Sequence, residues 1–298
     1  AISVLTLVPF FFLCRELRLS GFGMNLALAM MAPNSFLINY SQELRMYSML
    51  MLFTTVSVWM FVRYVNRLQN IWENIALLFT ANLLLVFTHY FGWLVVGVEA
   101  GVILCLSPRR TIRLIAPALI LLVLFAPWAY MVGRVATNEE VPFYNILWIE
   151  RPDIGSVLET MAAFTGASMS RRSLIIGILL FAAPLAFWMF QRFRRNGLWS
   201  AHRVVSMLLA LTVLPPVVVF LVSTIGTRSY WHTRYFIILA VPFVLLVAAL
   251  LTFLRPSWVR TAFAIGVVAF AFNGAARTFQ AGEFSRVKWD FIVAEITG

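Results

Sequence analysis

Charge is scarce in this sequence. Only 12% of its 298 residues are Asp, Glu, Lys or Arg, about half the share of a soluble domain, and Lys288 is the sole lysine. The two cysteines, Cys14 and Cys105, lie far apart in apolar runs and do not make the framework of a small secreted domain. These shortages exclude an ordinary soluble enzyme, a disordered chain and a disulfide scaffold. Hydrophobic residues make up 62% of the chain, which predicts a polytopic helical membrane protein.

Long apolar runs organise the chain. A helix needs about 20 apolar residues to cross the hydrocarbon core, and arginine clusters or polar turns divide this sequence into ten such runs. We therefore predict an all-α bundle of about ten transmembrane helices, with the polar break Thr88-His89-Tyr90 separating two of them. The runs are roughly Ala1–Cys14, Phe22–Ile38, Met46–Val62, Ile75–Phe87, Phe91–Leu106, Leu114–Val132, Leu174–Phe190, Val204–Ser223, Phe236–Leu254 and Thr261–Phe272.

Three segments depart from this regular pattern. Ala1–Cys14 is too short to span and lacks the basic flank of a signal peptide, so we expect a fragment whose first helix is truncated. Residues 133–172 form the one long connection, and connections of that length are often functional. The resulting prediction is a transmembrane domain over 1–276, with an external loop at 133–172. Residues 277–298 would begin a truncated external C-terminal region.

The net charge of +11 is divided unequally between the two sides of the predicted bundle. Alternation of the runs places thirteen basic and two acidic residues on one side, and ten basic and nine acidic residues on the other. The strongly basic side is expected to face the cytoplasm. No basic patch with interleaved stacking aromatics occurs, so no nucleic-acid partner is expected.

The nearly neutral, external side carries the informative polar motifs. In Tyr40–Tyr47 (YSQELRMY), a helix beginning at Ser41 would place Glu43 and Tyr47 on one face and Arg45 away from both. Such a segment suits a binding site. It equally suits a structural role in which Ser41 caps the helix and the tyrosines form an interfacial belt.

Two further external turns are rich in hydrogen-bonding side chains. Thr88–Gly92 contains His89 and Tyr90, but no second His or Cys stands at metal-ligand spacing. In Thr227–Tyr235, two arginines, a histidine and three aromatics occur within nine residues, a composition that suits a phosphate at the lipid boundary. An interfacial anchor explains both turns as well.

Glu99 is predicted to lie inside a membrane helix. An acid in that position is a candidate functional residue. A protonated, hydrogen-bonded side chain in a packed bundle is an equally good interpretation.

Two of these motifs resemble a known family. The segment YSQELRMY is similar to the YSQEARMY segment of bacterial GT-C-type glycosyltransferases, and Thr88–Gly92 matches their THYFG turn. These enzymes are like protein O-mannosyltransferases and the aminoarabinose transferase of lipid A, in the glycosyltransferase family 39-like group. Weaker similarities run in the same order along the chain at Pro33–Phe36, Pro127-Trp128, Trp148, Pro152, Arg234-Tyr235 and Pro242.

The resemblance implies a multi-helix GT-C fold in the bacterial cytoplasmic (inner) membrane, with an external active site. It implies a polyprenyl-phosphate sugar as donor, membrane lipids as surroundings and an unknown acceptor. The catalytic acidic residue of the family is expected upstream of Ala1, so the catalytic residue is not among those present and the fragment is expected to be inactive alone. Charge on the departing phosphate would be stabilised by arginine or by a divalent metal ion.

The resemblance also assigns roles to residues in this chain. Glu43 would organise the site or help to hold a metal, and Arg45 or Arg234 would face the phosphate. His89 and Tyr90 would line the pocket. Tyr47 and Tyr235 complete the set of substrate-binding candidates.

Two other functions fit the sequence. A transporter or flippase for a lipid-linked substrate would share the helices and the intramembrane acid, but transporters often contain repeated halves and interrupted helices. The clustering of polar motifs on one side favours an external enzyme site. A structural or assembly subunit is the third possibility, because the expected catalytic loop is missing.

Overall fold

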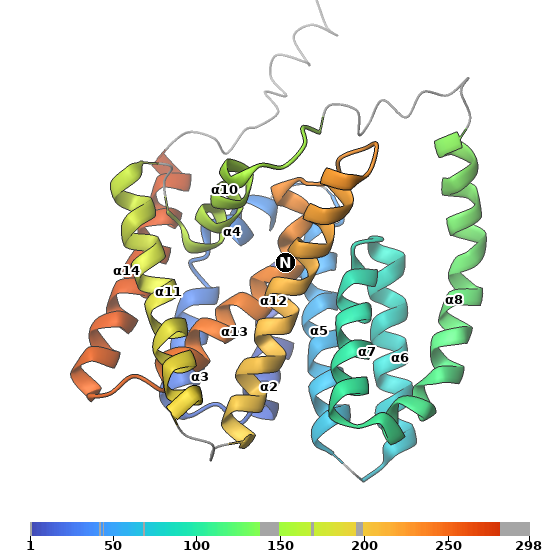
Figure 1. Cartoon of the computed structure of the whole chain (residues 1–298), viewed down its shortest axis with the longest axis horizontal. Helices are drawn as coiled ribbons and strands as arrows, with labels where there is room; N and C mark the ends of the chain where they lie inside the picture. The colour runs from blue at the N-terminus through green and yellow to red at the C-terminus, as the bar shows by residue number, and fades with distance from the viewer. Residues whose placement is uncertain are drawn as a thin grey trace, which may run out of the picture.

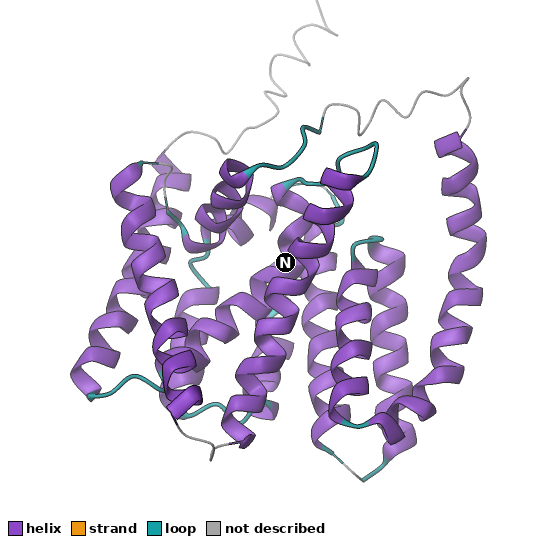
Figure 2. Cartoon of the chain, in the orientation of Figure 1, coloured by secondary structure: helices purple, strands orange, loops and turns teal. Residues whose placement is uncertain are grey.

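The chain is helical throughout the part that can be described. A computed structural model describes residues 2–41, 43, 45–67, 69–137, 149–167, 170–194 and 199–280. No strand occurs within these ranges (Figure 2), which confirms the all-α prediction. Trp148 and the part of the predicted C-terminal region beyond Gln280 lie outside the described residues.

The helices follow the apolar runs closely (Figure 1). The first half of the chain contains α1 (Ile2–Leu5), α2 (Leu7–Glu16), α3 (Gly21–Met31), α4 (Ser35–Ser41), α5 (Tyr47–Asn66), α6 (Ile71–Thr88), α7 (Gly92–Leu106) and α8 (Pro108–Thr137). The second half contains α10 (Ile154–Thr165), α11 (Arg171–Arg194), α12 (Trp199–Ile225), the 3-10 helix η1 (Thr233–Leu239), α13 (Ala240–Leu251) and α14 (Ser257–Gln280).

The number of helices able to cross a membrane is smaller than the number of apolar runs. Among the described residues, seven helices are long and apolar enough, or eight if α3 and α4, which meet at 49°, form one bent span. The run Phe91–Leu106 forms a helix of only 15 residues, Gly92–Leu106, and the first run is divided into α1 and α2. A multi-pass membrane protein is thus supported, whereas the count of ten spans is not confirmed.

Two predictions about connections can be compared with the structure. The break at Thr88-His89-Tyr90 is confirmed, because α6 ends at Thr88 and α7 begins at Gly92. The connection predicted over 133–172 is not irregular throughout: α8 extends to Thr137 and α10 lies within it. Asp153 starts α10 by accepting a hydrogen bond from the Ser156 backbone N–H at 2.8 Å, which holds the pKa of Asp153 below its usual value.

The centre of the bundle is α13. Its twelve residues, AVPFVLLVAALL, contain no polar side chain, and every one of them is buried. A helix that is apolar on all sides needs either lipid or protein around it, and α13 packs against α3, α5, α11, α12 and η1. Because η1 continues directly into α13, the packing of α13 fixes the position of η1 in the bundle.

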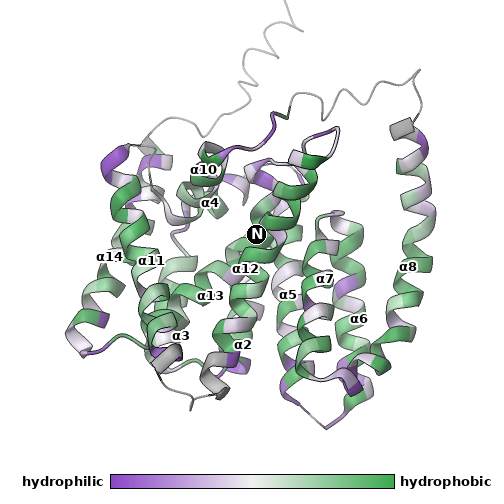
Figure 3. Ribbon diagram, in the orientation of Figure 1, coloured by the Kyte–Doolittle hydropathy of each residue, from purple (hydrophilic) through white to green (hydrophobic). Residues whose placement is uncertain are grey.

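The outer helices present apolar side chains to their surroundings. Only 6% of the apolar window of α8 is buried, and Figure 3 shows that its surface is largely hydrophobic along the middle of the helix. In water such a surface would be an aggregation hazard. In a bilayer the same surface is in contact with acyl chains, which is consistent with a membrane protein.

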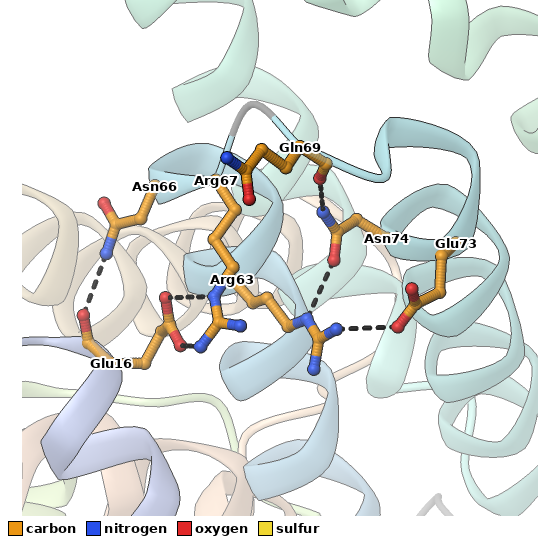
Figure 4. Close-up of polar contacts among 7 residues, drawn as sticks. All are labelled: Glu16, Arg63, Asn66, Arg67, Gln69, Glu73 and Asn74. Atoms are coloured by element: carbon orange, nitrogen blue, oxygen red, sulfur yellow. Dashed lines mark hydrogen bonds and ion pairs between the residues drawn. The ribbon is translucent and has the colours of Figure 1, made fainter.

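Ion pairs join the ends of three helices at one end of the bundle (Figure 4). Arg67, after α5, contacts both carboxylate oxygens of Glu16 on α2, at 2.6 and 3.1 Å. Arg63 on α5 pairs with Glu73 on α6 at 2.7 Å and donates to the Asn74 amide oxygen at 2.8 Å. The turns after α2 and α5 are thereby held side by side.

A third arginine at this end caps α5. The Arg110 guanidinium on α8 donates to the carbonyl oxygens of Tyr64 and Val65, at 3.1 and 2.7 Å. These carbonyls belong to the last turn of α5, where backbone acceptors lack intrahelical donors. We call this end, which carries Glu16, Arg63, Arg67 and Arg110, the basic end.

The sidedness of the bundle can be tested by cysteine labelling. In a Cys105→Ser background, we expect Gln69→Cys, at the basic end, to react with a membrane-impermeant maleimide only from the cytoplasmic side, because basic loops are retained there. Thr227→Cys, after α12, should react only from the opposite side. Both residues are exposed. The reverse pattern of labelling would overturn the orientation.

Candidate functional site

The three polar motifs of the sequence meet in the half of the bundle that lies away from the basic end. Figure 1 shows the chain that enters η1 in the upper part of the bundle and the α6–α7 turn lower down, below the upper ends of α8 and α12. η1 packs against α5 and α10, and α4 packs against α5 and α10 as well. We call the group of Tyr47, His89, Tyr90, Arg234 and Tyr235 the aromatic site.

The first motif does not form the helix that its sequence predicts. α4 ends at Ser41 and α5 begins at Tyr47, so Glu43 and Arg45 lie in the link between two helices and share no helix face. The prediction of a helix starting at Ser41 is therefore wrong. The Ser41 hydroxyl donates to the Ile38 carbonyl oxygen at 2.7 Å, so it binds an acceptor at the end of α4 and is not an N-cap for α5.

Aromatic packing explains why the chain breaks at this point. The Tyr40 ring lies 4.7 Å from that of Phe36 within α4 and 5.3 Å from that of Tyr47 at the start of α5. Both tyrosines are buried, Tyr47 with only 1% of its surface exposed. Edge-to-face contacts of this kind stabilise aromatic pairs. They hold the two helix ends together around the link.

The second and third motifs are in direct contact. The His89 ring stacks on Tyr90 at 4.4 Å and lies 5.4 Å from the Tyr235 ring. Phe91 lies 5.0 Å from the same Tyr235 ring. Residues about 145 positions apart in the sequence thus form one aromatic surface.

His89 is held in its neutral form. Its Nδ1 accepts the Phe91 backbone N–H at 3.1 Å, which leaves the ring hydrogen on Nε2. Burial lowers the pKa of His89 to about 4, because the imidazolium form would lose its water. His89 can therefore donate one hydrogen bond at neutral pH, but it does not supply positive charge.

Tyr90 is half-exposed beside three other tyrosines. Partial burial raises the pKa of Tyr90 above its usual value, and the nearby hydroxyls of Tyr235, Tyr230 and Tyr47 raise it further. The Tyr90 hydroxyl interacts with that of Tyr235. Tyr47, predicted as a site residue, therefore does lie with Tyr90 and Tyr235.

Arg234 brings positive charge to this surface. Its backbone N–H and its Nε approach His232 Nδ1 at 3.3 and 3.2 Å, and its Nη2 lies 2.9 Å from His232 Nε2. Its guanidinium carbon is 5.9 Å from the Tyr235 ring centre. His232, which also begins η1, positions the arginine. His232 was not among the predicted site residues. The sequence signal for its role is its position two residues before Arg234.

Arg45 and Glu43 lie on the link beside this surface. The charge of Arg45 acts on the Tyr235 hydroxyl, so Arg45 belongs to the same electrostatic environment as Arg234. Glu43 is half-buried, and its Oε2 is shielded from solvent.

α10, a helix from the long connection, packs against η1, which carries Arg234 and Tyr235; the sequence analysis did not predict this. The Thr160 hydroxyl on α10 lies 3.4 Å from that of Thr233 at the start of η1. The Ser229 hydroxyl donates to the Glu150 carbonyl oxygen at 2.7 Å. The connection is thus fastened to the turn that carries Arg234.

An apolar cavity of about 560 Å³ adjoins the site. It lies between α10, α11, α12 and α13, and its lining includes Trp231, Phe220, Phe243 and Leu246. Trp231 precedes His232 in the chain, and its ring lies 4.6 Å from that of Phe236 in η1. The cavity therefore ends beside the turn that presents Arg234.

The described residues do not provide a metal site on their own. No group of three His, Cys, Asp or Glu side chains within the described ranges is arranged to hold an ion.

Glu99 lies apart from the aromatic site, inside the bundle. Its Oε1 is 2.8 Å from the Ser57 hydroxyl and its Oε2 is 3.2 Å from the Asn82 amide nitrogen. Ser57 is also 2.6 Å from the Asn82 amide oxygen. The three side chains form a closed ring that joins α5, α6 and α7, and Glu99 is only 2% exposed.

The hydrogen bonds of this ring favour a neutral Glu99. The Ser57 hydroxyl has one hydrogen but contacts two oxygens, those of Asn82 and Glu99. A hydrogen on the Glu99 carboxyl group gives each of the three contacts its own donor. A neutral acid bonded on both oxygens is a stable arrangement in a low-dielectric bundle, so the structure favours the structural interpretation of this residue.

Comparison of the chain with protein-family models, curated proteins and solved structures finds no match. The class that the fold supports is a multi-pass helical membrane protein.

The neutral state of Glu99 gives a testable prediction. Glu99→Gln keeps one donor and one acceptor in the ring, so we expect the unfolding temperature in detergent to change little. Glu99→Leu leaves Ser57 and Asn82 with unused polar groups, and should destabilise the fold by about 1–2 kcal/mol. Thermal unfolding followed by circular dichroism measures both. An equal loss in the two variants would contradict a neutral carboxyl group.

The burial of His89 predicts a pH effect on stability. In the unfolded chain a histidine titrates near pH 6.5, whereas the pKa of His89 in the folded protein is about 4. The unfolded state therefore binds more protons between these values, and stability falls as the pH is lowered through this window.

Unfolding temperatures of the wild type and His89→Asn at pH 7.5 and pH 5 measure this effect. The wild type should lose more stability than the variant. Equal losses would show that His89 is not held neutral.

Proposed function

We propose that this chain belongs to a glycosyltransferase of the bacterial inner membrane, with a GT-C-like bundle of about ten helices. It would move a sugar from a polyprenyl-phosphate donor to an acceptor at the external face. The observation that carries this proposal is an apolar cavity whose lining includes Trp231, three residues before Arg234 on the segment that enters η1. A lipid phosphate needs an apolar channel for its tail and a cationic, hydrogen-bonding surface for its head group.

The aromatic site offers groups suited to the head of such a donor. Arg234, oriented by His232, would bind phosphate oxygens through its planar fork of donors, and Arg45 would add positive charge. His89 Nε2–H and the Tyr90 and Tyr235 hydroxyls are neutral hydrogen-bond partners for sugar hydroxyls. The rings of Tyr90 and Tyr235 offer apolar faces to the sugar.

The chemistry of transfer assigns a role to the arginines. An acceptor hydroxyl would attack the anomeric carbon while the bond from that carbon to the phosphate oxygen breaks, so the phosphate gains negative charge. Arg234 and Arg45 would stabilise that charge, which forms in the transition state and persists in the product. The proton of the acceptor hydroxyl would pass to a carboxylate acting as general base. Glu43, on the neighbouring link, would organise the site.

Donor binding tests this proposal on the chain itself. We expect the protein in nanodiscs to retain a radiolabelled polyprenyl-phosphate hexose. Arg234→Gln should lower the affinity about tenfold or more, because a charged hydrogen bond to phosphate is lost. Arg277→Gln is the matched control, since Arg277 is an exposed arginine on the last turn of α14, and it should bind as the wild type does.

Two outcomes would refute the proposal. One is a wild-type protein that does not retain the donor, and the other is an equal loss in the two arginine variants. Counterflow of the donor across proteoliposomes, with no transfer of its sugar to an acceptor, would instead establish the flippase alternative.

A further inference from the structure

A second cavity lies on the opposite side of α12 from the first, and the proposed function does not use it. It has a volume of about 710 Å³ and lies between α7 and α12. Its α7 wall is formed by the side chains or backbone of Trp93, Gly97, Gly101 and Cys105, and its α12 wall includes Leu214 and Val218. We call this cavity the α7–α12 groove.

The α7–α12 groove is open to the surface and has the length of one leaflet. Gly97, Gly101 and Cys105 are exposed, and a Cβ atom added at Gly97 or Gly101 would meet nothing within 4 Å. From Trp93 to Cys105, α7 rises about 18 Å at 1.5 Å per residue. Half of a hydrocarbon core of about 30 Å is a similar distance.

One end of the groove is cationic. Arg192, at the end of α11, and Arg203, at the start of α12, both line it. Arg192 donates to the Ser206 hydroxyl at 3.2 Å. The Arg203 Nε is buried without a hydrogen-bond acceptor, and the charge of Arg110 acts on Arg203 from α8.

No acid neutralises these two arginines in the described part of the chain. Its two ion pairs are Arg63–Glu73 and Arg67–Glu16. A buried cationic donor without a partner is costly, and an anion that reaches Arg203 would remove that cost.

We propose that the α7–α12 groove binds an anionic phospholipid of the leaflet on the basic side, with one acyl chain along Gly97 and Gly101 and the phosphate at Arg203 and Arg192. Three features of the groove support this occupant: its apolar wall, its length of one leaflet and its pair of arginines at the headgroup level. Basic pockets between membrane helices on the cytoplasmic side suit anionic head groups. A free phosphate would use the arginines but not the apolar wall.

Quenching by brominated lipid tests this proposal, because Trp93 lines the groove. The protein in neutral detergent is titrated with phosphatidylglycerol or phosphatidylcholine that carries brominated acyl chains. Trp93→Phe identifies the contribution of this tryptophan. We expect Trp93 to be quenched by phosphatidylglycerol at a concentration at least tenfold lower than by phosphatidylcholine. Equal quenching by the two lipids would overturn the assignment of the phosphate to the arginines.

Two variants test separately how the cationic end and the apolar wall of the groove contribute to lipid binding. Arg203→Gln should weaken the binding of phosphatidylglycerol about tenfold and leave phosphatidylcholine unchanged. Gly101→Leu, which fills open space, should weaken the binding of both lipids. Arg109→Gln is the matched control, because Arg109 is an exposed arginine at the same end that does not line the groove.

The source of the anion is tested by competition. Glycerol phosphate should not displace the brominated lipid at a concentration far above that of the lipid. Displacement would show a site for a free anion. A loss in Arg109→Gln as large as that in Arg203→Gln would show a general field effect in place of a site. Because the lipid comparison needs no arginine variant, it remains decisive even if Arg203→Gln does not fold.

Discussion

A polar side chain within a bilayer has no water to bind, and this constraint shapes the whole molecule. Polar groups must lie at the ends of the bundle or bind one another inside it. The ring of Ser57, Asn82 and Glu99 satisfies this condition in the interior. The other charged side chains discussed above lie toward the two ends of the bundle. α13, which has no polar side chain at all, can be surrounded on every side and fixes η1 in place.

The arginines at the two ends of the bundle make different interactions. At the basic end, arginines bind carboxylates and carbonyl oxygens and so stabilise helix ends. Arg203 differs, since its Nε is buried without an acceptor beside an apolar groove. At the opposite end, Arg234 is oriented by a histidine among tyrosines. Arginines held in these two ways are suited to bind anions.

The positions of most helices could be predicted from the sequence, but the details of the site could not. Apolar runs predict α5 to α8 and α11 to α14 because a single physical quantity, hydropathy over about 20 residues, decides them. The helix expected at Ser41 was wrong, since the packing of Tyr40 against Tyr47 joins the end of α4 to the start of α5 around a break in the helix. The contact of His89 with Tyr235 needed the tertiary arrangement of η1 against α5 and α7. The protonation state of Glu99 could be inferred only from the positions of its two partners, Ser57 and Asn82.

The central claim is that the aromatic site receives a lipid phosphate from the 560 Å³ cavity beside it. The most direct measurement is a cryo-EM structure of the protein in nanodiscs with polyprenyl phosphate added. The account predicts density for the phosphate against Arg234 and Tyr235, continuous with density for the prenyl chain past Trp231 into the cavity. Density for the lipid elsewhere, with the aromatic site and the cavity both empty, would contradict it.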